Sequence, residues 1–468
     1  MTDKGVNFKI SKPYFKVVVY TTNGFFSRKW QHLNADLNIM NKIFLNMVIT
    51  KGTVFMSFRT KLALLCMTAV INMPSVTLAE ERAQLEQSSA VTLSSLTQAV
   101  FKRQPARQSE LAQQQQINAH ADLAKATFAD VKSISLTHQN DVVGSSDGLQ
   151  EWEGMVEMPL WLPGQKQQQL LLSDKLSAEL PAYQQQIMLA ASAEVRELVW
   201  QVVMANTAAT EAYQTWQSSL KLEKDVTARV KAGELAGTER LLATNNALDM
   251  QTQYLLKNAH LDRTLTTYRA ITRERFLPEV YIEVLAEKDV IDQYHPDLMI
   301  LDQRINTLRA QQDLAHFDGA VNPSLSVGIR RERGTHGESF NNSMGLGISF
   351  ALDNDVYRRP AIADAAKALA DAEIARQQLE RELNISLFSY LHDLETKRLQ
   401  LKLLNEQNET TQQYLVLQQR AFDLGDLDLV SLIRSQALAS ETHNRKLALE
   451  IEINYTIALV NQALGVIL

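Results

Sequence analysis

The stretch FDLGDL at residues 422–427 decides the fold, because a similar stretch, VKAGEL, stands at residues 230–235. These two stretches are 192 residues apart. The same distance along the chain separates VEMPL at residues 156–160 from ISFAL at residues 348–352. Similar stretches repeated at one spacing are typical of a chain built from two copies of one unit.

Three segments follow from this repetition. Residues 91–270 form the first repeat, residues 294–468 form the second, and residues 271–293 form the linker between them. Each repeat has the same expected order: a helix, two short strands, a very long helix, a tight turn and a returning helix.

The part of the chain before the repeats has the pattern of an export signal. Residues 56–79 begin with a basic flank, continue with an apolar core and end in small residues, which predicts cleavage near Ala79. Residues 1–55 would then be an upstream extension of the gene model. The start codon stays open between Met1 and Met56.

The composition favours long helices. The chain has only 17 Gly and 10 Pro in 468 residues, and 45% of its residues are hydrophobic. The formal net charge is −6, with basic residues concentrated before residue 80, which argues against nucleic acid as a partner. The single cysteine, Cys66, lies in the signal segment, so the mature chain would have no disulfide and no cysteine metal site.

The second repeat shows its elements most clearly. Polar and apolar residues alternate over residues 324–330 and 343–350, which predicts two strands with unlike faces, and the charged residues 331–342 between them predict a loop. A helix is expected before the strands, over residues 296–317. After them, residues 361–421 contain no Pro or Gly and predict one long helix, which at 1.5 Å per residue is roughly 90 Å long.

The first repeat has the same pattern in weaker form. Helices are expected over residues 99–128 and 165–231, and strands over residues 131–138 and 152–160. Pro181 falls early in the long helix, where we expect it to break or kink the helix.

A glycine ends each long helix, Gly233 in the first repeat and Gly425 in the second, and a returning helix follows at once. Each repeat should therefore contain a helical hairpin that packs as a coiled coil. Four two-faced strands cannot close a sheet alone, so several chains would have to pool their strands if lipid covers one face.

The chain resembles the TolC family of outer-membrane efflux proteins. The resemblance rests on Pro296, on NPSLS at residues 322–326, on the strand ending at residues 347–352, on the turn at residues 422–429 and on NQALG at residues 461–465. It implies a mostly α-helical fold with a small β-barrel contribution: a homotrimer whose twelve strands form a barrel in outer-membrane lipid, above an α-helical tunnel in the periplasm.

The same resemblance implies a passive channel in a tripartite efflux system. The expected partners are a periplasmic adaptor (membrane fusion protein) and an inner-membrane pump. The NPSLS strand followed by RER at residues 331–333 is similar to the heavy-metal-efflux, CzcC-like branch, which implies heavy-metal cations as cargo.

The hairpin turns are the candidate functional sites. Threefold symmetry would repeat their acidic residues into rings at the periplasmic mouth, as a gate or cation-selective constriction. The predicted constriction acids are Asp423, Asp426, Asp428 and Glu234. The predicted adaptor-docking residues are Gly233, Leu235, Gly425 and Leu427. The alternative is that these acids are ordinary solvated residues at helix ends.

Catalytic patterns are missing from the sequence. No histidines pair at metal-ligand spacing on one helix face, and no nucleophile elbow or phosphate-binding loop occurs. We therefore expect no enzyme activity and no cofactor. The alternative function is a periplasmic coiled-coil structural or adaptor protein without a barrel, although adaptors normally carry one hairpin rather than two.

Overall fold

The structure is a computed structural model that describes residues 85–318, 321–352 and 355–468. The predicted extension over residues 1–55 and the predicted signal peptide over residues 56–79 lie outside the described residues. The described residues belong to one compact unit, Arg82–Leu468.

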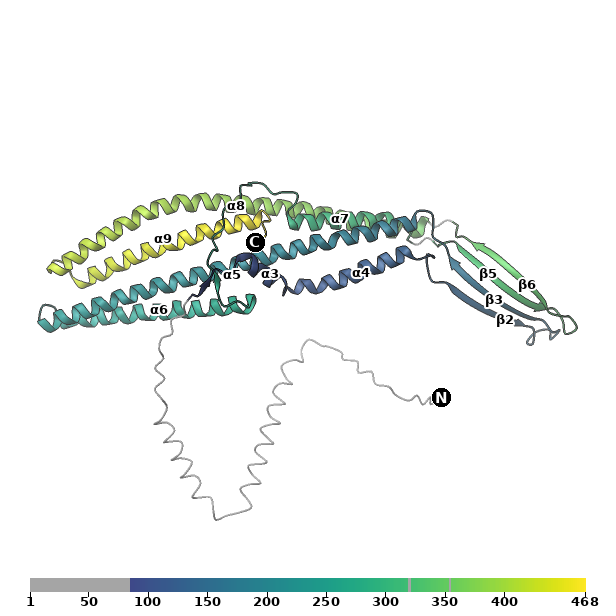
Figure 1. Cartoon of the computed structure of the whole chain (residues 1–468), viewed down its shortest axis with the longest axis horizontal. Helices are drawn as coiled ribbons and strands as arrows, with labels where there is room; N and C mark the ends of the chain where they lie inside the picture. Colours follow the sequence, from purple (N-terminus) through teal and green to yellow (C-terminus); the bar gives the residue numbers. More distant parts are fainter. Residues whose placement is uncertain (1–84, 319–320, 353–354) are drawn as a thin grey trace, which may run out of the picture. The chain divides into compact units, whose positions relative to one another are not determined.

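The first half of this unit contains two short helices, a 3₁₀ turn, three strands and a helical hairpin (Figure 1). Its elements are β1 (Gln87–Ser88), α3 (Leu93–Phe101), a 3₁₀ turn (Pro105–Arg107), α4 (Gln108–Lys125), β2 (Ser133–Asn140), β3 (Gln150–Pro159), α5 (Gln165–Ala232) and α6 (Gly237–Thr272).

The second half repeats the order of helix, strand pair and hairpin. Its elements are β4 (Leu277–Pro278), α7 (Pro296–Ala315), β5 (Ser324–Arg333), β6 (Asn341–Ser349), α8 (Asp355–Leu424) and α9 (Leu429–Ala463).

Proline explains where the helices differ from the prediction. The single helix expected over residues 99–128 is wrong, because Pro105 starts a 3₁₀ turn between α3 and α4. The break expected at Pro181 is also wrong, because α5 runs unbroken for 68 residues. Pro181 is exposed, and so is Ser177, whose carbonyl loses its helical donor there, so water can take that place.

The long helices form a row in the order α6, α5, α9, α8 (Figure 1). Helix α5 packs along α6, α8 packs along α9, and α5 contacts α9 to join the two hairpins. The main core lies along α5, where the apolar positions expected from the sequence, including Val195, Val199 and Val202, are fully buried against α6 and α9.

The four longer strands form one antiparallel sheet at the end of the helices opposite the hairpin turns (Figure 1). The strand order is β2-β3-β5-β6, so β3 of the first repeat pairs with β5 of the second. Strands β5 and β6 extend into the predicted loop, which is reduced to residues 334–340. The pairing of β3 with β5 joins the two predicted strand pairs into a single sheet.

The register gives the sheet two unlike faces. Residues directly opposite each other share a face, and Val156 lies opposite both Ile134 and Val327. The apolar face carries Ile134, Leu136, Val156, Met158, Leu325, Val327, Ile329, Met344, Leu346 and Ile348. The other face carries mainly serine, threonine, glycine and glutamate. Most of the apolar face is exposed in one chain; Ile134, for example, is 82% exposed.

Among the described helices, none is both long enough and apolar enough to cross a membrane.

Candidate functional site

The two hairpin turns have the same backbone geometry. Gly233 and Gly425 both adopt φ 84°, in the left-handed region that favours glycine. The N–H of Glu234 donates to the carbonyl of Arg229, and the N–H of Asp426 donates to the carbonyl of Ala421, at 2.9 Å in each case. These bonds end each helix in a Schellman motif, and an added Cβ at either glycine would meet nothing within 4 Å.

The two turns also pack against each other. Phe422 is buried in a cluster with Leu222 and Val226 of α5 and with Leu429 and Leu432 of α9. Leu235 and Leu427, two of the predicted docking residues, are half-buried against the same cluster. The turns are therefore held by a small core of their own at the end of the hairpins.

Arg229 links the hairpins through charge. Its Nη2 lies 2.8 Å from Asp423 Oδ1, and its Nε lies 3.0 Å from Asp225 Oδ2. The guanidinium also lies over the Phe422 ring, 5.0 Å from its centroid. One arginine of the first repeat thus binds a carboxylate and an aromatic ring of the second.

The four predicted constriction acids have different surroundings. Asp428 caps helix α9, accepting from the Ser431 N–H at 2.6 Å, and this hydrogen bond lowers the pKa of the Asp428 carboxyl. Asp423 pairs with Arg229. Asp426 and Glu234 are exposed, and within the described part of the chain no side-chain partner is recorded for either. Of the four predicted constriction acids, Asp426 and Glu234 are therefore the two that neither pair with a described side chain nor cap a helix.

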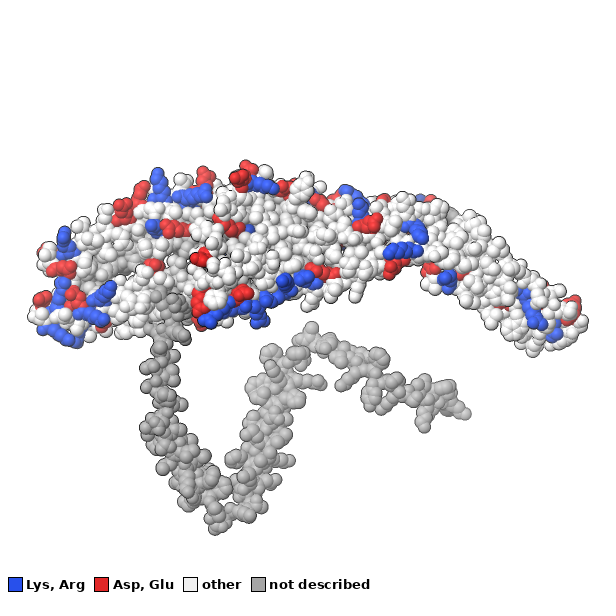
Figure 2. Space-filling model, viewed as in Figure 1, with Lys and Arg blue, Asp and Glu red and all other residues white. Residues whose placement is uncertain are grey.

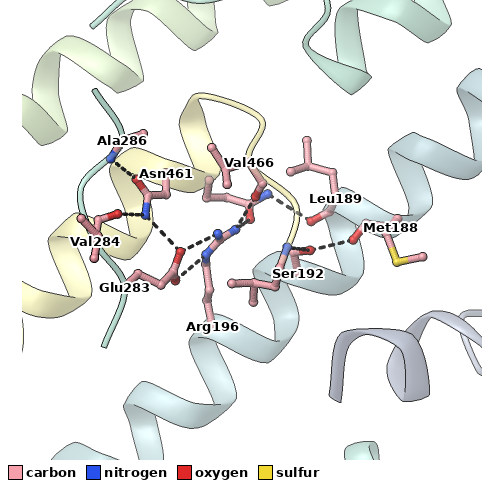
Figure 3. A network of polar contacts seen from close by, with 11 residues as sticks. Met188, Leu189, Ser192, Arg196, Glu283, Val284, Ala286, Asn461 and Val466 are labelled. Atoms are coloured by element: carbon pink, nitrogen blue, oxygen red, sulfur yellow. Dashed lines mark hydrogen bonds and ion pairs between the residues drawn. The ribbon is translucent and has the colours of Figure 1, made fainter. Parts of the chain in front are cut away.

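Sequence reasoning missed a buried ion pair in the middle of the row. Arg196 of α5 is 2% exposed, and its Nε and Nη2 donate to Glu283 at 2.8 and 2.7 Å (Figure 3). Its Nη1 donates to the Gln462 side chain and, at 3.1 Å, to the Val466 carbonyl. The available signal was an arginine inside the apolar run of α5, where a charge needs a partner.

The network around this pair continues through Asn461. Its amide donates to Glu283 Oε2 at 3.1 Å and to the Val284 carbonyl at 2.9 Å, and its Oδ1 accepts from the Ala286 N–H at 3.0 Å (Figure 3). Helix α5, the segment after β4 and the carboxyl end of α9 are thereby fixed to one another. Asn461 and Gln462, the NQ pair of the NQALG stretch, thus both take part in this network.

Among the residues that the structure describes, no three His, Cys, Asp or Glu side chains lie in an arrangement that could hold a metal ion.

The fold is similar to solved outer-membrane proteins. The CmeC outer-membrane channel of Campylobacter jejuni aligns with a TM-score of 0.60 and 14% identity, over 80% of this chain and 85% of that chain. VceC from Vibrio cholerae aligns with a TM-score of 0.63 and 11% identity, over 80% of this chain and 96% of that chain. CusC, a protein that forms a transmembrane channel, aligns with a TM-score of 0.63 and 12% identity, over 84% of this chain and 97% of that chain.

The sequence matches no protein-family model and none of the curated protein sequences. The structural similarity, at 11 to 14% identity, defines the fold. The chain has the TolC-type outer-membrane channel fold, mostly helical with one four-stranded sheet, and the prediction of this fold from the sequence is confirmed.

Proposed function

We propose that this chain is the outer-membrane channel of a tripartite efflux system. It conducts cargo passively from a periplasmic adaptor and an inner-membrane pump to the exterior, without enzymatic chemistry. The observation that carries the proposal is a four-stranded sheet whose apolar face is exposed and whose edge strands, β2 and β6, each have one unpaired side within the described chain.

Lipid is the partner that the apolar face fits. In water, so many exposed Ile, Leu, Val and Met side chains on one face would be costly, whereas in hydrocarbon they are favoured. Open strand edges are not tolerated in hydrocarbon, so the edges must pair with other copies of the sheet. With three copies, as the family resemblance implies, the barrel has twelve strands.

The outer helices of the row carry matching apolar stripes. On α6, Leu241, Leu248 and Leu255 recur every seven residues and are exposed, as at a coiled-coil seam. On α8, Phe388 and Leu399 belong to a similar exposed stripe. Since α6 and α8 lie at opposite ends of the row of helices, a neighbouring copy on each side would cover these stripes. The rows of successive copies would then form a continuous tunnel wall.

The hairpin turns would then form the periplasmic mouth of the tunnel. We propose that Asp426 and Glu234 line the constriction. Asp423 would hold the two hairpins together through its ion pair with Arg229, and Asp428 would cap helix α9. Leu235 and Leu427, beside Gly233 and Gly425, would form the surface that contacts the adaptor, because they are half-buried apolar residues at the apex.

Heavy-metal cations remain the proposed cargo, on the resemblance of the strand and loop to the CzcC-like branch. The matching experiment compares metal tolerance of a strain lacking the gene with that of the same strain carrying the chain. Equal tolerance, with other exported compounds affected, would assign the channel to another cargo.

The experiment for the function expresses the chain from Met56, separates the membranes and measures the assembly and conductance of the purified protein. We expect trimers in the outer-membrane fraction, tubular particles by electron microscopy and stable conductance in planar bilayers. A monomeric periplasmic rod without conductance would refute the channel and favour the coiled-coil structural or adaptor protein.

A further inference from the structure

The apolar face of the sheet changes character at the end farthest from the helices. Successive rows across the strands are apolar as far as the row containing Ile329. In the next row, Arg331 lies opposite Trp152, and Trp152 lies opposite His138. One row further, Arg333 follows on the same face. Figure 2 shows Lys and Arg atoms at this end of the sheet, with Asp and Glu atoms beside them.

The two arginines on this face lack carboxylate partners among the described residues. Arg331 and Arg333 both contact the ring of Phe340, at 4.4 and 4.9 Å from its centroid. The Nε of Arg333 is buried without a hydrogen-bond partner. Arg330, on the opposite face of the same strand, pairs with Glu151 and Glu332, each at 2.7 Å. The charge of Arg330 is thus neutralised on the polar face, whereas the charges of Arg331 and Arg333 on the apolar face are not paired with a described carboxylate.

Aromatic rings mark the boundary between the apolar rows and this charge. The His138 and Trp152 rings stack with centroids 3.9 Å apart. Tryptophan and tyrosine concentrate at membrane–water interfaces, where an apolar ring with a polar edge is best placed. In the lipid that the proposed function requires, the row of Trp152 would lie at the depth where acyl chains give way to headgroups, and the arginines would lie at headgroup level.

We propose that Arg331 and Arg333 bind the phosphate group of a lipid headgroup in the outer leaflet, with the lipid's acyl chains on the row of Ile329 and Met344 and on the apolar row next to it, which contains Val327 and Leu346. This inference rests on the proposed function, which places the apolar face in lipid. Guanidinium groups bind phosphate oxygens in bidentate geometry, and two of them on one face fit a doubly charged headgroup.

The test measures binding of bisphosphorylated lipid A to the purified full-length protein in neutral detergent. The double variant Arg331→Gln/Arg333→Gln should bind about 25-fold more weakly than the wild type, because each arginine near an anionic headgroup contributes separately. The matched control, Arg330→Gln, changes the same strand on the opposite face and should bind like the wild type. Dephosphorylated lipid should bind the wild type as weakly as the double variant binds lipid A.

The outcomes separate this inference from the proposed function. If the double variant forms conducting trimers and binds lipid A like the wild type, the phosphate site is refuted and the channel stands. If inorganic phosphate at equal concentration displaces the lipid completely, the site recognises free phosphate, and the lipid proposal is wrong. Conductance of the double variant in neutral lipid shows that it has folded. If it does not conduct, the single variants Arg331→Gln and Arg333→Gln replace it, and each should bind lipid A about 5-fold more weakly than the wild type.

Discussion

Removing Arg196 should destabilise the chain far more than removing an exposed arginine. The variant Arg196→Met leaves the Glu283 carboxylate buried without its cation and also removes the donor to the Val466 carbonyl. Breaking a buried ion pair on one side costs about 3–5 kcal/mol, because the remaining charge stays desolvated. We expect the free energy of unfolding to fall by about that amount.

Guanidinium unfolding in detergent, followed by fluorescence, measures this change. Trp200 is buried in the main core along α5, so its fluorescence reports the unfolding of that core. The matched control is Arg309→Met, because the Arg309–Glu373 pair is equally short at 2.8 Å, but its side chains are 57% and 42% exposed. This control should lose less than about 1 kcal/mol.

A second variant tests the cause of the loss. In Arg196→Met/Glu283→Leu no buried charge is left alone, so most of the lost stability should return. If Arg196→Met and Arg309→Met lower the midpoint equally, with equal slopes, the reasoning from burial is refuted.

Three further predictions concern the helix ends. His295 is buried, burial lowers its pKa from the usual value near 6.5, and its Nδ1 accepts from the Asp297 N–H at 3.2 Å. Because the unfolded chain then binds the proton more readily, stability should fall as pH drops below about 6.5; the slope of unfolding midpoint against pH should flatten in His295→Asn. Gly425→Ala should lower the free energy of unfolding by about 1–2 kcal/mol through the positive φ alone, and Gly425→Asn should lower it less. Thermal unfolding measures both losses, and an equal loss in the two variants would indicate a steric clash of the new side chain instead. Asp426→Ala/Glu234→Ala should relieve divalent-cation block in single-channel recordings, and unchanged block would remove both acids from the constriction.

Elements set by local chemistry could be read from the sequence. The glycines at 233 and 425 end the long helices because only glycine adopts φ 84° at no cost. The strands of the second repeat follow from their period-two alternation. Pro181 misled the prediction because a proline at an exposed position can remain within a helix whose stability comes from packing elsewhere.

Long-range pairings could not be read from the sequence. The pairing of β3 with β5 joins strands of different repeats, and each strand's alternation is compatible with several neighbours. Arg196 and Glu283 are 87 residues apart, and no local pattern specifies that they meet. Asp423 was expected to face a constriction, and its link to Arg229 depends on how the two hairpins pack.

The directions of the edge strands restrict how copies of the sheet can join. In the order β2-β3-β5-β6 the strands alternate in direction, so β2 and β6 run oppositely. An isologous joint of β6 with β6 would either reverse one copy end for end or turn its apolar face to the other side. The heterologous joint of β6 with β2 of the next copy keeps both orientations. A sheet with this strand order is therefore suited to cyclic symmetry, in which the helical hairpins of all copies point in the same direction along the symmetry axis.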